Sequence, residues 1–123
     1  MIEELKERFA FLKDDVLAIL VFGSHARGEG APSSDVDICI VAPESRPSEV
    51  LSKVYQNMDT KRLDVYCFSE LPLHLKMDVI HHHKTLFVRD KPALYEHFYL
   101  YRKLWADEER RHRVTKEEIL AML

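Results

Sequence analysis

The sequence predicts one α/β domain with a helical C-terminal extension. Short apolar runs suited to strands alternate with amphipathic segments suited to helices, the pattern of helices packed on a sheet. A length of 123 residues fits one domain, and a 46% apolar fraction suffices for one core. No repeat, low-complexity tract or linker divides the chain. We therefore expect a single unit over residues 1–123, with its core at about 1–90 and C-terminal helices at about 91–123.

The first elements follow from the spacing of apolar residues. A first amphipathic helix is indicated by four residues at helical spacing, Ile2, Leu5, Phe9 and Leu12. The continuous apolar run VLAILVF at 16–22, rich in branched side chains, predicts a buried central strand. A second strand is expected at about 35–42.

Helices and strands continue to alternate in the second half. Pro47 begins a helix, because proline suits the first helical turn. Alternating residues predict a third strand at 62–68. A helix over 71–83 and a short edge strand over 85–89 follow.

The C-terminal extension is predicted to contain two helices. The first covers residues 92–113. Thr115 followed by Glu118 forms a capping box, which predicts the start of a last helix over 116–123.

Composition restricts the class of protein. A net charge of −3 argues against direct nucleic-acid binding, which needs an excess of clustered Lys and Arg. The N-terminal segment is charged and amphipathic, unlike a signal or transit peptide, and no apolar run reaches the roughly 18 residues that span a bilayer. We expect a cytoplasmic protein without membrane contact, in which Cys39 and Cys67 are buried thiols rather than a disulfide.

Three aspartates interrupt the apolar strands. Asp35 and Asp37 are two residues apart, so they project from the same face of the second strand. Asp64 occupies a similar position in the third strand. If these strands are neighbours, the three carboxylates converge into a hard-cation site of the kind that magnesium prefers when phosphates complete its shell. The alternative is that Asp35 caps a turn while the other two lie exposed at the sheet edge.

The segment GSHARG, directly after the first strand, has features of a phosphate-binding turn. Gly23 ends the strand, backbone N–H groups and the Ser24 hydroxyl can donate to phosphate oxygens, and Arg27 adds a positive fork. A P-loop is excluded because Glu29 follows Gly28 where that motif requires lysine.

The spacing Gly23-Ser24, ten residues, then Asp35-Val36-Asp37 resembles the signature of the DNA polymerase beta-like nucleotidyltransferase superfamily, in particular its minimal MNT members. The resemblance implies the fold of that superfamily, a small mixed sheet flanked by helices. It also implies that Gly23 and Ser24 hold the β and γ phosphates of ATP. Asp35, Asp37 and Asp64 would ligate two Mg²⁺ ions, with Asp64 as the candidate general base. Arg27 matches a usually basic position of the motif.

MNT proteins are antitoxins usually encoded beside a HEPN-domain partner. The resemblance therefore implies transfer of AMP from ATP to a hydroxyl, expected to be a tyrosine, of a HEPN toxin in a hetero-oligomer. The alternative is a non-catalytic antitoxin or assembly subunit that neutralises its partner by binding. A small-molecule nucleotidyltransferase is disfavoured because only about fifty residues follow the third strand and its helix, too few for a substrate domain.

Overall fold

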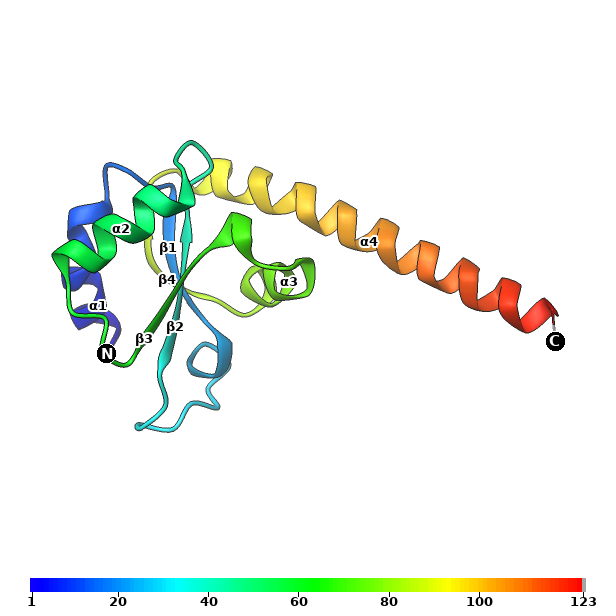
Figure 1. Cartoon of the computed structure of the whole chain (residues 1–123), viewed down its shortest axis with the longest axis horizontal. Coiled ribbons are helices and arrows are strands. Elements are labelled where there is room, and N and C mark those ends of the chain that lie inside the picture. The colour runs from blue at the N-terminus through cyan, green and yellow to red at the C-terminus, as the bar shows by residue number, and fades with distance from the viewer. Residues whose placement is uncertain (123) are drawn as a thin grey trace.

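The computed structural model describes residues 1–122, and for residues 112–115 it describes the backbone alone. Four strands form its sheet: β1 (Ala18–Phe22), β2 (Val36–Val41), β3 (Leu63–Cys67) and β4 (Lys84–Val88). Their order is β3-β2-β1-β4 (Figure 1). β1 pairs antiparallel with β2 and β4, whereas β2 and β3 are parallel, so the sheet is mixed as the resemblance implied. The expectations of a central first strand and an edge strand near residue 85 are confirmed.

Helices cover both faces of the sheet. They are α1 (Ile2–Arg8), α2 (Pro47–Asn57), α3 (Leu73–His81) and α4 (Lys91–Met122). α1 and α2 pack on one face, while α3 and the first turns of α4 pack on the other (Figure 1). Pro47 stands at the first helical position of α2, as predicted.

Strand alternation divides the core into two clusters and decides where polar side chains lie. Ile38 and Ile40 of β2 pack toward α1 and α2, while Cys39 and Val41 pack toward α3 and α4. Because successive side chains point to opposite faces, Asp37 shares the α3–α4 face with Cys39. In β1 all five residues are buried, as expected for a central strand covered on both sides.

Two predicted helix boundaries are wrong. The first helix ends at Arg8, because Phe9 leaves helical backbone geometry and a 3₁₀ turn over Ala10–Leu12 follows. α4 runs as one helix past position 115, where we expected a break. No glycine or proline occurs after Pro92, so a capping-box sequence alone did not stop the helix. The Thr115 side chain and Leu123, both part of that prediction, lie outside the described residues.

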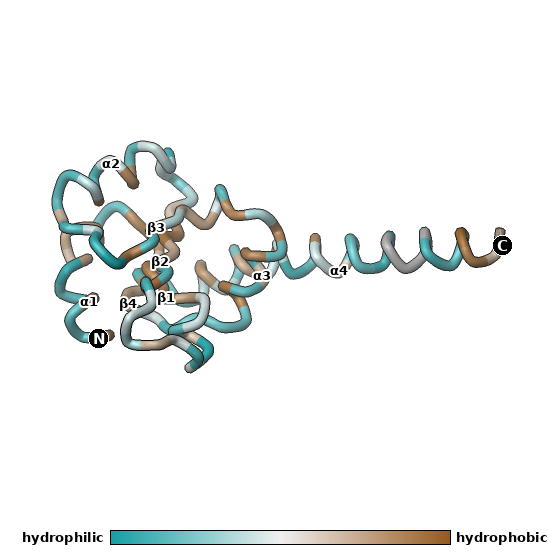
Figure 2. The backbone as a smooth tube through the Cα atoms, turned by 60° about the horizontal axis from the view of Figure 1, so that its bottom comes forward, coloured by the Kyte–Doolittle hydropathy of each residue, from teal (hydrophilic) through white to brown (hydrophobic). Residues whose placement is uncertain are grey.

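The C-terminal part of α4 extends beyond the rest of the molecule, as Figures 1 and 2 both show. Within residues 1–122, no helix is both long and apolar enough to cross a membrane. Cys39 and Cys67 are free and buried, as predicted, and burial raises the pKa of both thiols, that of Cys67 to about 11.

Candidate active site

The parallel pairing of β2 and β3 places Asp37 directly opposite Asp64. The register joins Val36 to Leu63 and Asp37 to Asp64. Side chains at paired positions of neighbouring strands project from the same face, and here that is the face covered further along by α3 and α4. The third strand therefore lies beside the second, which is the condition on which the predicted approach of the carboxylates depended. Asp35 comes immediately before β2, two positions from Asp37.

Neighbouring charged side chains affect the pKa of Asp37. Partial burial raises the pKa of Asp37, and the negative charges of Asp64 and Asp35 raise it further, while His25 and Arg27 act in the opposite direction. Three carboxylates and two basic side chains from the GSHARG segment thus share one end of the sheet. Such a grouping has an excess of negative charge when no cation is bound.

The turn after β1 approaches Asp37 so closely that only glycine fits. Gly23 has a φ of 71°, in the left-handed region that disfavours L side chains. A Cβ atom added there would lie 3.2 Å from Cγ of Asp37 and closer still to its Oδ2. Gly23 begins a 3₁₀ turn, Gly23–His25, rather than the first turn of an α-helix. Within the described residues, the Ser24 hydroxyl makes no hydrogen bond, so it is free to donate to a ligand.

His25 holds the loop between β1 and β2 together. Its Nε2 lies 3.2 Å from the carbonyl oxygen of Ser34, just before the Asp35-x-Asp37 pair. Gly30 packs against the imidazole so tightly that an added Cβ would lie 2.6–2.8 Å from ring atoms. The sequence reasoning gave His25 no role. The pairing of a histidine with a glycine five residues later was the available signal.

Arg27 is engaged by carboxylates of its own chain. It forms ion pairs with Glu29 at 3.3 Å and with Asp78 of α3 at 3.0 Å. The hydrogen bond to Glu29, with the charge of Asp78, raises the pKa of Arg27. Asp78 in turn lies 3.4 Å from Nδ1 of His82. The sequence predicted Arg27 as a phosphate ligand but did not reveal Asp78 as its partner.

Tyr66 is a further residue that the sequence reasoning missed. It stands two positions after Asp64, so the two side chains share a face of β3. The residue is 40% exposed, and its ring meets Phe22 edge-on at a centroid distance of 5.8 Å. Burial, followed by the charges of Asp64 and Asp37, raises the pKa of Tyr66. An aromatic ring two residues after a candidate site carboxylate was the signal available in the sequence.

The carboxylates fit a hard cation by their chemistry. Carboxylate oxygens on neighbouring strands are ligands of the kind that Mg²⁺ prefers. A cation would relieve the carboxylate repulsion that, after burial, raises the pKa of Asp37. Among the side chains that the structure describes, in residues 1–111 and 116–122, no group of three or more His, Cys, Asp or Glu could hold a metal ion.

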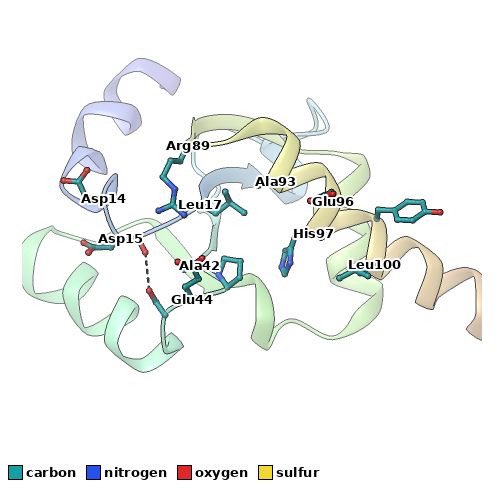
Figure 3. Close-up of a pocket in the computed structure, with 13 residues that line it drawn as sticks. Asp14, Asp15, Leu17, Ala42, Glu44, Arg89, Ala93, Glu96, His97 and Leu100 are labelled. Atoms are coloured by element: carbon teal, nitrogen blue, oxygen red, sulfur yellow. Dashed lines mark hydrogen bonds between the residues drawn. The ribbon is translucent and has the colours of Figure 1, made fainter.

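A cavity of about 710 Å³ lies at the opposite end of the sheet (Figure 3). Its lining includes Leu17 and Ala42, which adjoin the ends of β1 and β2 distant from Phe22 and Asp37. Arg89 and residues of the first turns of α4, among them His97, complete the wall. Asp35, Asp37 and Asp64 therefore lie at the other end of the sheet and do not line this cavity.

Known proteins resemble this chain in sequence and in fold. A protein of Methanocaldococcus jannaschii, named as a protein adenylyltransferase, is 42% identical over 99 residues, which cover 80% of this chain and 76% of that protein. A chain from the crystal structure of a toxin–antitoxin with AMP-PNP superposes with a TM-score of 0.74 at 13% identity, over 97% of this chain and 98% of that one.

A second solved structure extends the likeness in fold. It contains the tri-AMPylated Shewanella oneidensis HEPN toxin in complex with MNT antitoxin, and its matching chain has a TM-score of 0.67 at 14% identity, over 98% of this chain and 99% of that one. The family model for polymerase beta nucleotidyltransferases matches residues 3–92. This chain belongs to the polymerase beta-like nucleotidyltransferase family.

Proposed function

We propose that this chain transfers AMP from ATP to a protein hydroxyl, a tyrosine of a HEPN toxin, and thereby acts as its antitoxin in the cytoplasm. The observation that carries the proposal is the placement of Asp37 opposite Asp64, with Gly23 packed against Asp37. The relative in Methanocaldococcus jannaschii is named for protein adenylyl transfer, and the fold is shared with chains of toxin–antitoxin complexes.

The residues at the end of the sheet that carries Gly23 and Asp37 suit a nucleoside triphosphate. Gly23 leaves space that any side chain would fill, and the Ser24 hydroxyl is available to a phosphate oxygen. We assign the β and γ phosphates to this turn. Arg27 lies close enough to Asp37 to lower its pKa, so its guanidinium is near the same edge and can reach a phosphate if it leaves Asp78.

The carboxylates suit phosphoryl-transfer chemistry. Asp35, Asp37 and Asp64 would hold two Mg²⁺ ions, which supply charge neutralisation for the triphosphate and a lowered pKa for the acceptor hydroxyl. Asp64 is the candidate base that takes the hydroxyl proton on a carboxylate oxygen. The acceptor oxygen bonds to the α-phosphorus, the bond to the bridging oxygen of the β-phosphate breaks, and pyrophosphate leaves. The protein contributes mainly position and charge.

We propose that residues of about 1–90 perform this chemistry while the C-terminal extension meets the partner. α4 exposes large apolar side chains along its length, with more than half of each exposed for Tyr95, Tyr99 and Leu100. Aromatic and apolar side chains on an exposed helix are typical of protein interfaces. A partner docked there would supply the acceptor segment.

The test is to incubate this chain with its HEPN-domain partner, ATP and Mg²⁺, and to weigh the partner by intact mass spectrometry. We expect mass increments of one or more AMP units. Asp64→Asn or EDTA should abolish them. If the partner stays unmodified but is inhibited equally well by the Asp35→Asn, Asp37→Asn double variant, neutralisation by binding replaces the enzymatic function.

A further inference from the structure

Arg62, directly before β3, has an unusual backbone conformation. Its φ is 65°, and it is the one non-glycine residue with a positive φ among residues 1–122. Such a conformation is unfavourable for an arginine and persists where the surroundings impose it, often at functional sites. Glycine or asparagine would satisfy the backbone better, so the arginine side chain itself needs a reason to be there.

That reason is visible in the contacts of Arg62 with the segment before β2. Its Nη2 donates a hydrogen bond to the carbonyl oxygen of Ser33 at 3.2 Å. Its own carbonyl oxygen accepts a hydrogen bond from the backbone N–H of Val36 at 3.0 Å. Arg62 therefore contacts the chain on both sides of Asp35, two positions before it and one position after it.

His25 completes the attachment of this segment. Its ring contacts the carbonyl of Ser34, one of the two residues between the points held by Arg62. Ser33, Ser34 and Val36 are thus each fixed by a hydrogen bond to another part of the chain. The backbone of Asp35 has little freedom, and the direction in which Asp35 and Asp37 leave the loop is set by these contacts.

We propose that Arg62 is a positioning residue for the candidate site: it holds the Ser33–Val36 segment so that Asp35 and Asp37 face Asp64. This inference rests on the proposed function. Arg62 acts through the backbone and does not itself contact the nucleotide. In its left-handed conformation, both its side chain and its carbonyl reach the same segment.

Arg62→Gly separates the backbone conformation of Arg62 from its side-chain hydrogen bond, because glycine relieves the backbone strain while removing the bond to Ser33. We expect an apo melting temperature equal to or above that of the wild type. The kcat for AMP transfer should fall about ten- to a hundredfold, the range caused by small misplacements of reacting groups. The Mg²⁺ concentration needed for half of the thermal shift with ATP should rise. Arg62→Lys, which can still donate to Ser33, should restore most of the kcat and most of the Mg²⁺ dependence.

Lys61→Ala is the matched control. Lys61 precedes Arg62 in the same turn and lines the same cavity of about 480 Å³, but within the described residues its side chain has no hydrogen bond or ion pair. It should behave like the wild type in all three measurements. Wild-type kcat and Mg²⁺ dependence in Arg62→Gly would overturn the proposal. A fall in apo melting temperature that accounts for the lost activity would also overturn it, in favour of a purely structural role.

The thermal shift also separates this proposal from the proposed function. If the wild type binds ATP with Mg²⁺ but never modifies its partner, AMP transfer fails as a function. A thermal shift that is weakened in Arg62→Gly but equal to the wild-type shift in Lys61→Ala would then still support the positioning role. If the wild type shows no shift with ATP and Mg²⁺, the site assignment fails and the role of Arg62 fails with it.

Discussion

Arg27, in the turn after β1, places its Nη1 3.1 and 3.0 Å from the two carboxylate oxygens of Asp78 on α3. The pair joins the candidate phosphate turn to a helix 51 residues away in sequence. If Arg27 is a phosphate ligand as proposed, a phosphate and Asp78 would compete for the same guanidinium.

We therefore expect Asp78→Asn to tighten ATP binding by up to about fivefold, the range expected of a partly exposed ion pair. Isothermal titration with ATP and Mg²⁺ measures this directly. Arg27→Gln, the reciprocal variant, should weaken binding. Weaker binding in Asp78→Asn would instead mean that Asp78 holds Arg27 in its productive place.

Gly23 and Gly28 offer a matched pair of substitutions. Both have a positive φ, 71° and 77°, so alanine is strained by about 1–2 kcal/mol at either position. At Gly28 an added Cβ meets nothing within 4 Å, whereas at Gly23 it overlaps the Asp37 carboxylate. Gly23→Ala should therefore lose more stability than Gly28→Ala in urea unfolding, and should also lose the thermal shift with ATP and Mg²⁺. Equal losses in the two variants would argue against the close packing of Gly23 on Asp37.

Asp37 should make folding stability depend on pH. Burial and the neighbouring carboxylates raise its pKa in the folded state above the ordinary value, so the folded chain holds this proton more tightly than the unfolded chain. Its contribution to stability is full at a pH below the ordinary aspartate pKa and is lost as the pH rises through the raised value. Asp37→Asn should therefore gain stability relative to the wild type between acid and neutral pH, while losing AMP transfer. Unfolding curves across that range test this, and a large loss of stability at neutral pH would indicate a structural role.

Lys76 tests a structural role away from the site. It is 8% exposed, it donates to the carbonyl oxygens of Ser69 and Leu71, and its ammonium lies 5.7 Å from the ring centroid of Phe68. Lys76→Ala leaves those carbonyls without their donor and should cost about 1–3 kcal/mol in unfolding free energy. ATP affinity at a temperature where the variant is folded should not change. An unchanged unfolding free energy would mean that water replaces the ammonium.

The sequence predicted those parts of the site that depend on local periodicity. The period of two along a strand predicted that Asp35 and Asp37 share a face, although Asp35 lies just before β2. The sequence left open whether the second and third strands are neighbours, and their pairing in the structure brings Asp64 opposite Asp37. Contacts between distant segments could not be predicted in this way. The pair of Arg27 with Asp78 depends on how α3 packs, and the left-handed conformation of Arg62 has no signal in its residue type.

The last prediction separates docking from chemistry. Leu104 is 50% exposed on α4, at helical spacing from the exposed Leu100. Leu104→Glu places a charge among the exposed apolar side chains of α4. It should weaken binding of the proposed HEPN-domain partner by at least about tenfold, as expected when a contact residue at an interface is disrupted. The catalytic core is distant in sequence, so the thermal shift with ATP and Mg²⁺ should stay unchanged.

Ala106→Glu is the control for this variant, because it adds the same charge about 200° around the helix from Leu104. Ala106 is exposed, so the change should not disturb folding. Surface plasmon resonance with immobilised partner compares the two. If both variants bind the partner like the wild type, α4 is not the docking surface, and the partner must reach the Asp37–Asp64 edge by another route.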